Sequence, residues 1–269
     1  MSEPGGFDLL HPVIQHHVVN TLGWPTLRPL QEESLAPLLA GADAVLLAPT
    51  AGGKTEAALL PLLTAMEQQA WPGLSLIYVC PLKALLNNLQ PRVAAYAAWL
   101  GRTASVRHGD TTAGDRGRQS RERPSILLTT PESLEAMLVS TLIDAPRMFG
   151  DVRAVVVDEV HAFAGDDRGW HLLAVLERLT EMAGHPIQRV GLSATVGNPA
   201  AILEWLRGTS KRHGVVVDPP KEPKPRAIAV ILEADPFLLA SQAAGLAAGK
   251  KSLFFCESRA LTEAIAERM

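Results

Sequence analysis

The chain has 269 residues, of which 47% are hydrophobic and 20% are charged, a composition that excludes a disordered protein and indicates one large or two small domains. The formal charge of −3 excludes a uniformly basic protein that coats nucleic acid, although a local basic groove is compatible with it. The two cysteines have no CxxC spacing, and no apolar run resembles a membrane span or a signal peptide. We therefore expect a reduced, cytoplasmic compartment, no membrane association, no disulfide and no zinc site.

Short apolar runs alternate with longer segments of helical periodicity. The strand candidates are continuously apolar, which is typical of strands covered on both faces in a parallel sheet. They are Ala44–Ala48, Leu74–Cys80, Thr103–Val106, Ile126–Thr129, Ala154–Val157 and Ile187–Leu192. The helix candidates are Thr55–Gln69, Lys83–Leu100, Glu132–Ser140, Gly169–Ala183 and Pro199–Arg207. This alternation predicts an α/β fold, a doubly wound, mainly parallel sheet with helices on both faces and a ligand site at the carboxyl ends of its strands.

A proline-rich segment divides the chain. Residues 218–225 contain four prolines, which favour an extended, semi-rigid linker. We therefore expect one domain over residues 1–219, followed by the linker and the start of a second α/β domain over residues 220–269. The later elements are predicted as strands at Ala227–Leu232 and Ser252–Cys256, and helices at Pro236–Ala248 and Arg259–Met269. A unit of this size would bury too little surface to be stable alone, so we expect a larger protein.

The segment Ala48–Thr55 follows a predicted strand, opens a predicted helix and has phosphate-loop spacing, with alanine in place of the first glycine. Small residues let backbone N–H groups surround a phosphate at a helix N-terminus. Lys54 would reach the β- and γ-phosphates of ATP, and the Thr55 hydroxyl would hold Mg²⁺. The nucleotide contacts predicted here are Thr50, Ala51, Gly52, Gly53, Lys54, Thr55 and Glu56. A glycine-rich turn with a solvated lysine is the alternative, which the strand–loop–helix context disfavours.

A second apolar run, Ala154–Val157, ends in two adjacent carboxylates. Asp158 would bind Mg²⁺ through water, and Glu159 would orient or deprotonate the attacking water. Adjacent carboxylates at a buried strand end repel each other, and a divalent cation relieves that repulsion. A strand running into a solvated acidic turn is the alternative, but the phosphate loop upstream favours a nucleotide site.

In order and spacing, these segments and Ser193–Thr195 at a third strand end resemble the superfamily 2 helicases of the DExH type. Ala48–Thr55 corresponds to motif I, Asp158–His161 to motif II and Ser193–Thr195 to motif III. Stretches at 129–138, 157–169 and 191–199 look most like the Lhr (large helicase-related) group. The resemblance implies a RecA-like first domain, with residues 253–259 similar to motif IV at the start of a second RecA-like domain.

The resemblance also implies roles for individual residues. Arg28–Gln31 looks like the Q motif, which would place Gln31 on the adenine edge. His161 is placed to hydrogen-bond towards Ser193 or Thr195 and so to couple the γ-phosphate to the nucleic-acid side; a satisfied buried histidine is the alternative. At Ala51 relatives more often carry glycine, and we expect alanine to be tolerated unless that position requires positive φ. The predicted catalytic set is Lys54, Asp158, Glu159 and His161.

Cys80–Leu85 and Thr129–Leu134 are similar to the family's segments along the nucleic-acid strand. Proteins that track a nucleic-acid backbone grip phosphates with amides, hydroxyls and a few cations. The contacts predicted here are Pro81, Lys83, His108, Thr130, Pro131 and Ser133. Arginines at 116, 118, 121 and 123 form either a basic arm towards phosphates or a solvated helix, and the sequence leaves both open. Trp24 either packs in the core or flanks the adenine pocket.

We therefore predict an ATP-dependent nucleic-acid helicase that uses ATP and Mg²⁺ and acts on single-stranded or partly duplex nucleic acid, DNA rather than RNA. The arginine fingers of the family come from a late motif, Gln-x-x-Gly-Arg-x-Gly-Arg, that this sequence lacks. Because such fingers contribute about 10³–10⁵ in rate, we expect weak hydrolysis by this chain without the rest of the helicase or a partner protein. The alternative is a nucleotide-binding or interaction module that does not turn over.

Overall fold

The computed structural model describes residues 6–49, 51–194, 196–220, 228 and 230–267. The chain divides into two compact units, Met1–Pro220 and Lys221–Met269. Within the described residues, every helix is too short or too polar to cross a lipid bilayer.

The first unit is built on a parallel sheet of seven strands in the order β3-β4-β2-β5-β6-β1-β7. The strands are β1 (Asp43–Leu47), β2 (Leu76–Val79), β3 (Ala104–Arg107), β4 (Ile126–Thr129), β5 (Ala154–Val157), β6 (Gln188–Ser193) and β7 (Gly214–Val217). The doubly wound α/β prediction is confirmed, and its six strands are present. β7 was not predicted, although its sequence is as short and as apolar as that of β5; it is an edge strand whose first three residues are only partly buried.

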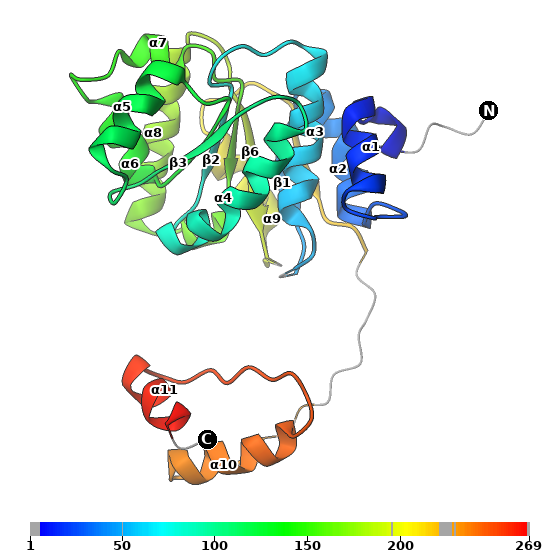
Figure 1. Cartoon of the computed structure of the whole chain (residues 1–269), viewed down its shortest axis with the longest axis vertical. Coiled ribbons are helices and arrows are strands. Elements are labelled where there is room, and N and C mark those ends of the chain that lie inside the picture. The colour runs from blue at the N-terminus through cyan, green and yellow to red at the C-terminus, as the bar shows by residue number, and fades with distance from the viewer. Residues whose placement is uncertain (1–5, 50, 195, 221–227, 229, 268–269) are drawn as a thin grey trace. The chain divides into compact units, whose positions relative to one another are not determined.

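Helices cover both faces of this sheet (Figure 1). They are α1 (Pro12–Asn20), α2 (Pro29–Leu39), α3 (Lys54–Gln68), α4 (Lys83–Ala98), α5 (Ala113–Glu122), α6 (Pro131–Leu138), α7 (Ala145–Phe149), α8 (Asp167–Ala183) and α9 (Pro199–Arg207), with short 3₁₀ turns η1 (Gly6–Leu9) and η2 (Val160–Ala162). Buried side chains of α1 to α4 pack on one face, and those of α6 to α9 pack on the other. Alternate residues of each central strand enter the two cores, which explains their continuous apolarity.

The helices α1, α2 and α7 were not predicted. The internal proline of α2, Pro37, does not account for this, because α3 and α4 also contain an internal proline and were predicted. α5 is so polar that Gln119 is its one buried residue. The solvated helix that the sequence left open for the arginine cluster is therefore the structure adopted there.

The second unit contains α10 (Pro236–Ala247) and α11 (Arg259–Ala266). The strands predicted at 227–232 and 252–256 are wrong: their described residues have no strand structure, and residues 227 and 229 lie outside the described part of the chain. A strand requires a hydrogen-bonded neighbour, and neither segment has one among the described residues. Their apolar side chains consequently face solvent, with Leu232 and Phe255 each 94% exposed.

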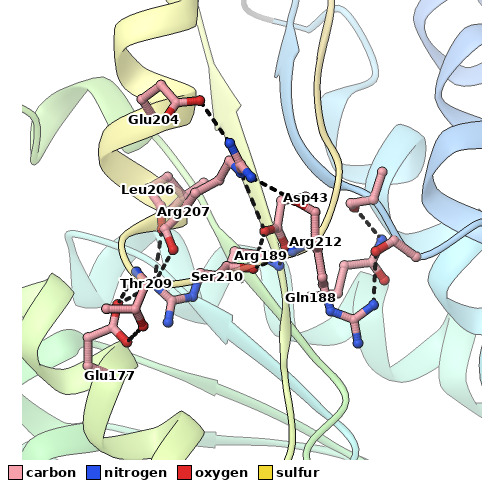
Figure 2. A network of polar contacts seen from close by, with 12 residues as sticks. Asp43, Glu177, Gln188, Arg189, Glu204, Leu206, Arg207, Thr209, Ser210 and Arg212 are labelled. Atoms are coloured by element: carbon pink, nitrogen blue, oxygen red, sulfur yellow. Dashed lines mark hydrogen bonds and ion pairs between the residues drawn. The ribbon is translucent and has the colours of Figure 1, made fainter.

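A network of buried polar side chains lies at the amino-terminal ends of β1 and β6 (Figure 2). Arg189 in β6 is only 1% exposed. Its guanidinium donates to the Glu177 carboxylate of α8 at 2.9 Å and to the carbonyl oxygens of Leu206 and Arg207 in α9 at 3.2 and 3.0 Å. It also donates to the Thr180 hydroxyl at 3.2 Å. The Arg189 side chain therefore joins β6 to two helices, α8 and α9.

Asp43 extends this network across the sheet. One carboxylate oxygen accepts the backbone N–H of Arg189 at 2.8 Å, and the other accepts the Ser210 hydroxyl at 2.6 Å. Burial raises the pKa of this carboxyl group. At the opposite ends of the same two strands, the Ala48 N–H donates to the Ser193 carbonyl oxygen at 3.3 Å. The network therefore sets the register of the strands that carry the phosphate-loop segment and Ser193.

Candidate functional site

A cavity of about 500 Å³ lies at the carboxyl ends of β1 and β5. It brings together segments far apart in the sequence: the loop before α3, the start of α2, the middle of α4 and the two carboxylates after β5. Its lining residues are Trp24, Arg28, Gln31, Ala51, Gly52, Gly53, Lys54, Thr55, Glu56, Arg92, Tyr96, Asp158 and Glu159. Trp24 thus lines the cavity while also packing against the core.

The loop between β1 and α3 has no room for larger side chains. A Cβ on Gly52 would lie 2.6 Å from that of Ala48, and a Cβ on Gly53 would lie 2.6 Å from the Gln31 amide nitrogen. Gly53 also has a φ of 80°, which favours glycine. α3 begins directly after it, so the free N–H groups of its first turn lie at the loop and attract an anion. Thr50, predicted to contribute here, lies outside the described residues.

Ala51 adopts a φ of 62°, so the tolerance expected for alanine at this position does not apply. A left-handed conformation costs a residue with a Cβ about 1–2 kcal/mol. Alanine at position 51, where glycine would adopt this φ without strain, is therefore a source of backbone strain.

We expect Ala51→Gly to stabilise the first unit. Relief of strain exceeds the entropy cost of roughly 0.5–1 kcal/mol that glycine carries, so the thermal midpoint should rise by about 2–4 °C. Ala95→Gly, an exposed position inside α4, is the matched control and should lower the midpoint, since glycine weakens a helix by about 1 kcal/mol. A lower midpoint for Ala51→Gly, measured by calorimetry, would show that the positive φ is not strained.

Lys54 is buried, and its ammonium donates to the carbonyl oxygens of Ala48 and Pro49 at 2.9 and 3.3 Å. The charge is therefore held inside the loop, against the first turn of α3. The Lys54 ammonium therefore already lies in the loop where a polyphosphate would bind.

Asp158 is held in place from two sides. The Tyr78 hydroxyl of β2 donates to one carboxylate oxygen at 2.9 Å, and the N–H of Glu159 donates to the other at 2.9 Å. Burial raises the pKa of Asp158; the Tyr78 hydrogen bond opposes that rise, and the nearby Glu159 charge adds to it. Burial also raises the pKa of Tyr78, so this hydroxyl stays a neutral donor. Glu159 has a φ of 48°, in the left-handed region, and directly precedes the 3₁₀ turn η2.

This donor set suits Mg²⁺. The cavity offers the carboxylates of Asp158 and Glu159 and the Thr55 hydroxyl, all of them oxygen ligands. Among the described residues no cluster of three or more His, Cys, Asp or Glu forms a complete metal cage. Mg²⁺ normally takes one or two carboxylates and completes its shell with water and substrate phosphates, so the residues fit a nucleotide-bound Mg²⁺.

We expect Asp158→Asn to raise the thermal midpoint near neutral pH and to abolish the Mg²⁺ dependence of nucleotide binding. Because burial raises the pKa of Asp158, its contribution to the free energy of unfolding is fully present only at pH values below the ordinary pKa near 3.8. That contribution is lost as the pH rises through the raised pKa, where the buried carboxyl group becomes charged. The gain of the variant, about 2–4 °C for each kcal/mol, should therefore shrink as pH falls towards 4.

Asp110→Asn is the control for this pH series. The hydrogen bond from Lys83 lowers the pKa of the exposed Asp110 carboxyl, so removing its charge should not raise the midpoint at neutral pH. A gain for Asp158→Asn that grows on acidification would contradict the burial argument.

Gln31 is 1% exposed, and its amide is tied to the loop. Its side-chain oxygen accepts the N–H of Arg28 at 3.0 Å, and its side-chain nitrogen donates to the Gly53 carbonyl oxygen at 3.5 Å. The Arg28 guanidinium donates to the Ala51 carbonyl oxygen. These contacts join the start of α2 to the phosphate loop, on the side where an adenine contact is predicted.

Two residues of α4 that the sequence did not single out also enter the cavity. Arg92 donates to the Thr55 hydroxyl at 3.1 Å and lies 3.4 Å from the buried carboxylate of Glu56. The Tyr96 hydroxyl donates to the same carboxylate at 3.0 Å. Burial raises the pKa of Tyr96, which keeps it a donor. Their spacing of four residues on a predicted helix, with a polar residue at each position, is the signal that could have identified them.

His161 links the acidic segment to β6. Its Nδ1 lies 3.0 Å from the Ser193 hydroxyl oxygen, and its Nε2 lies 3.3 Å from a Glu159 carboxylate oxygen. The expected contact to Ser193 is present, while Thr195, the other expected partner, lies outside the described residues. The imidazole is partly exposed, so it is not a fully buried core histidine.

The residues predicted to contact nucleic acid follow the carboxyl ends of β2, β3 and β4, which are neighbours in the sheet. Pro81 and Lys83 follow β2, His108 follows β3, and Thr130, Pro131 and Ser133 follow β4. Parallel strands present these ends at one edge, so the three loops extend the edge that holds the cavity.

The polar groups of these loops bind one another. Lys83 pairs with Asp110 at 2.9 Å, and buried His108 contacts the Asn87 side-chain oxygen at 3.1 Å. The Thr130 hydroxyl accepts the Ser133 N–H at 3.3 Å and so caps α6. The loops are therefore ordered by their own contacts, which positions cations and hydroxyls before any ligand binds.

The arginine cluster does not form one patch. Arg116 lines a second cavity of about 700 Å³ together with Arg107, His108 and Ser133. Arg118 pairs instead with Asp115 at 2.9 Å, and Arg123 pairs with Asp151 at 3.0 Å. Among these three cluster arginines, the cavity beside the nucleic-acid loops therefore receives only Arg116.

Comparison with known proteins supports the motif assignment. A family model described as DEAD/DEAH box helicase matches residues 28–202. The Lhr helicase/probable uracil glycosylase of Mycolicibacterium smegmatis is 36% identical over 207 residues, which cover 71% of this chain and 13% of that protein. The ATP-dependent helicase Lhr-Core of Methanothermobacter thermautotrophicus is 34% identical over 232 residues, 78% of this chain and 26% of that protein. The chain thus spans a small part of the curated relatives that it matches.

A solved helicase structure also resembles this chain. The structure of Mycobacterium smegmatis helicase Lhr bound to ssDNA and AMP-PNP has a TM-score of 0.82 and 30% identity, covering 98% of this chain and 36% of that one. The resemblance predicted from the motifs is confirmed, and the matched residues run from the start of the Q motif segment into α9. The chain belongs to the DEAD/DEAH box helicase family, and its relatives include helicases of the Lhr group.

Proposed function

We propose that this chain hydrolyses ATP with Mg²⁺ to drive movement along a single nucleic-acid strand, with DNA preferred over RNA. The observation that carries the proposal is the cavity that holds Lys54, Asp158 and Glu159 together, beside the loops predicted to contact nucleic acid. The ssDNA and AMP-PNP bound to the Mycobacterium smegmatis relative support both ligand classes and favour DNA.

In this proposal the loop amides and Lys54 bind the polyphosphate, and Thr55 and Asp158 hold Mg²⁺. Bound Mg²⁺ neutralises charge that develops on the transferred phosphoryl group. Glu159 accepts a proton from, or orients, the attacking water, because its carboxylate lines the cavity and reaches His161. His161 and Ser193 then connect the hydrolysis site to the adjacent strand end.

We also propose that residues 1–219 form the first RecA-like domain and that residues 220–269 contain the linker and begin the second. The match of the Mycobacterium smegmatis helicase to 98% of the chain supports this division. The arginines that complete hydrolysis in the family would then come from elsewhere in the helicase or from a partner protein, and turnover by this chain would be slow.

The test measures ATP hydrolysis by this chain with no nucleic acid, with single-stranded DNA and with RNA of the same sequence. We expect slow turnover that DNA raises more than RNA, and turnover at least about 10²-fold lower from Glu159→Gln. Binding of a fluorescent ATP analogue is measured in parallel. Nucleotide binding without any hydrolysis would contradict the proposed activity of this chain, and equal stimulation by both strands would contradict the preference for DNA.

A further inference from the structure

Arg168, in the first turn of α8, contacts three separate segments of the first unit. Its guanidinium donates twice to one carboxylate oxygen of Glu132, at 2.8 and 3.1 Å. It also donates to the Pro81 carbonyl oxygen at 3.1 Å. Its central carbon lies 5.5 Å from the centre of the Phe163 ring. The planar guanidinium satisfies all these contacts together, which a lysine ammonium does not.

The contacts belong to two functional parts of the sheet edge. Phe163 is fully buried and follows His161, which contacts Glu159 and Ser193. Pro81 instead lies in the loop after β2, and Glu132 lies in the first turn of α6 after β4, between the predicted nucleic-acid contacts Pro131 and Ser133. Arg168 therefore spans from the nucleotide side to two segments on the nucleic-acid side.

The first turn of α8 packs tightly against the backbone of Phe163. A Cβ on Gly169 would lie 2.1 Å from the Phe163 carbonyl oxygen, so the first turn of α8 packs directly on the segment after His161. A shift of Phe163 is thus carried to α8 and to the guanidinium beside it. Close packing of this kind transmits displacements.

We propose that Arg168 is a positioning residue that couples nucleotide binding at the cavity to nucleic-acid binding at the loops after β2 and β4. The inference rests on the proposed function, since it requires both ligands. Coupling is reciprocal: nucleotide changes the affinity for nucleic acid by the same factor by which nucleic acid changes the affinity for nucleotide.

Arg178 provides a matched control. It also lies on α8 and also pairs with a glutamate of α6, Glu135, at 2.7 Å. Its side chain is about as exposed as that of Arg168, 45% against 42%. No contact of Arg178 reaches Pro81 or Phe163 among those recorded for the described residues. An effect that merely required α6 and α8 to be joined would appear in both variants.

The experiment measures the dissociation constant of a labelled single-stranded DNA with and without AMP-PNP and Mg²⁺. We expect a ratio of at least about fivefold in the unaltered chain, in the usual range for coupled sites. Arg168→Ala should bring the ratio to within about twofold of one while nucleotide affinity without DNA stays within twofold. Arg178→Ala should leave the ratio unchanged, and Arg168→Lys should not restore it.

Thermal unfolding and two further variants keep the outcomes distinct. Thermal unfolding checks each variant; if Arg168→Ala does not fold, Arg168→Lys and Glu132→Gln carry the test and should also reduce the ratio. An unchanged ratio in folded variants, or an equal loss in Arg178→Ala, would overturn the inference while leaving the proposed function standing. A ratio of one in the unaltered chain would overturn it too. Failure of the unaltered chain to bind nucleotide or DNA would instead contradict the proposed function, and the inference with it.

Discussion

Replacing Glu159 with glutamine is expected to lower the rate of ATP hydrolysis by about 10²–10⁴-fold, the usual contribution of a positioned general base. Glutamine keeps the shape of the side chain but cannot accept the proton of the attacking water. Because Glu159 lines the cavity without being predicted to hold the polyphosphate, nucleotide affinity should change less than about threefold. Steady-state turnover and equilibrium binding of a fluorescent ATP analogue, measured on the same preparation, separate the two effects.

Glu135→Gln is the control for this experiment, because Glu135 pairs with His171 and Arg178 outside the cavity. Its turnover should match that of the unaltered chain. If Glu159→Gln hydrolyses ATP at the unaltered rate, the proton acceptor is another group. A loss of nucleotide binding in the variant would assign Glu159 to ligand binding instead.

Replacing Arg189 with methionine is expected to lower the free energy of unfolding by about 1–3 kcal/mol, the usual cost of leaving a buried hydrogen-bond acceptor without its donor. The substitution leaves the carbonyl oxygens of Leu206 and Arg207 without their donor in the interior. It also removes one partner of the Glu177 carboxylate, whose pKa the Arg189 hydrogen bond helps to keep low despite burial. Urea unfolding followed by circular dichroism measures the change.

Arg118→Met serves as the comparison for Arg189→Met, since both partners of its ion pair are exposed and such pairs contribute less than about 1 kcal/mol. A loss below about 1 kcal/mol for Arg189→Met would mean that the network in Figure 2 is dispensable for stability.

The sheet of the first unit was predictable because its central strands are buried on both faces. Ala154–Val157 and Ile126–Thr129 have the predicted bounds, since a continuous apolar run has no other stable place in a sheet covered by helices. The same signal failed at 252–256: apolarity identifies a segment able to form a strand, but a strand also needs a hydrogen-bonded neighbour, which the sequence does not specify.

The candidate site also contains residues that the sequence predicted and residues that it did not. Residues whose chemistry depends on a local turn, such as Gly53 and Lys54, were readable from spacing. Tyr78 and Arg168 were not, because their partners lie 80 and 87 residues away and only the folded sheet brings them together. The positive φ of Ala51 also lay beyond prediction, as backbone angles of a loop depend on the whole turn.

The Asp43–Arg189 network gives β1 and β6 unequal ends. Side-chain bonds from two helices and the segment before β7 clamp their amino-terminal ends, whereas one backbone hydrogen bond joins Ala48 to Ser193 beyond the other. Side-chain contacts are therefore added to the sheet ladder at one end of β1 and β6, the end away from the nucleotide cavity. Substitutions in this network reach the phosphate loop and Ser193 through the register that the two strands share.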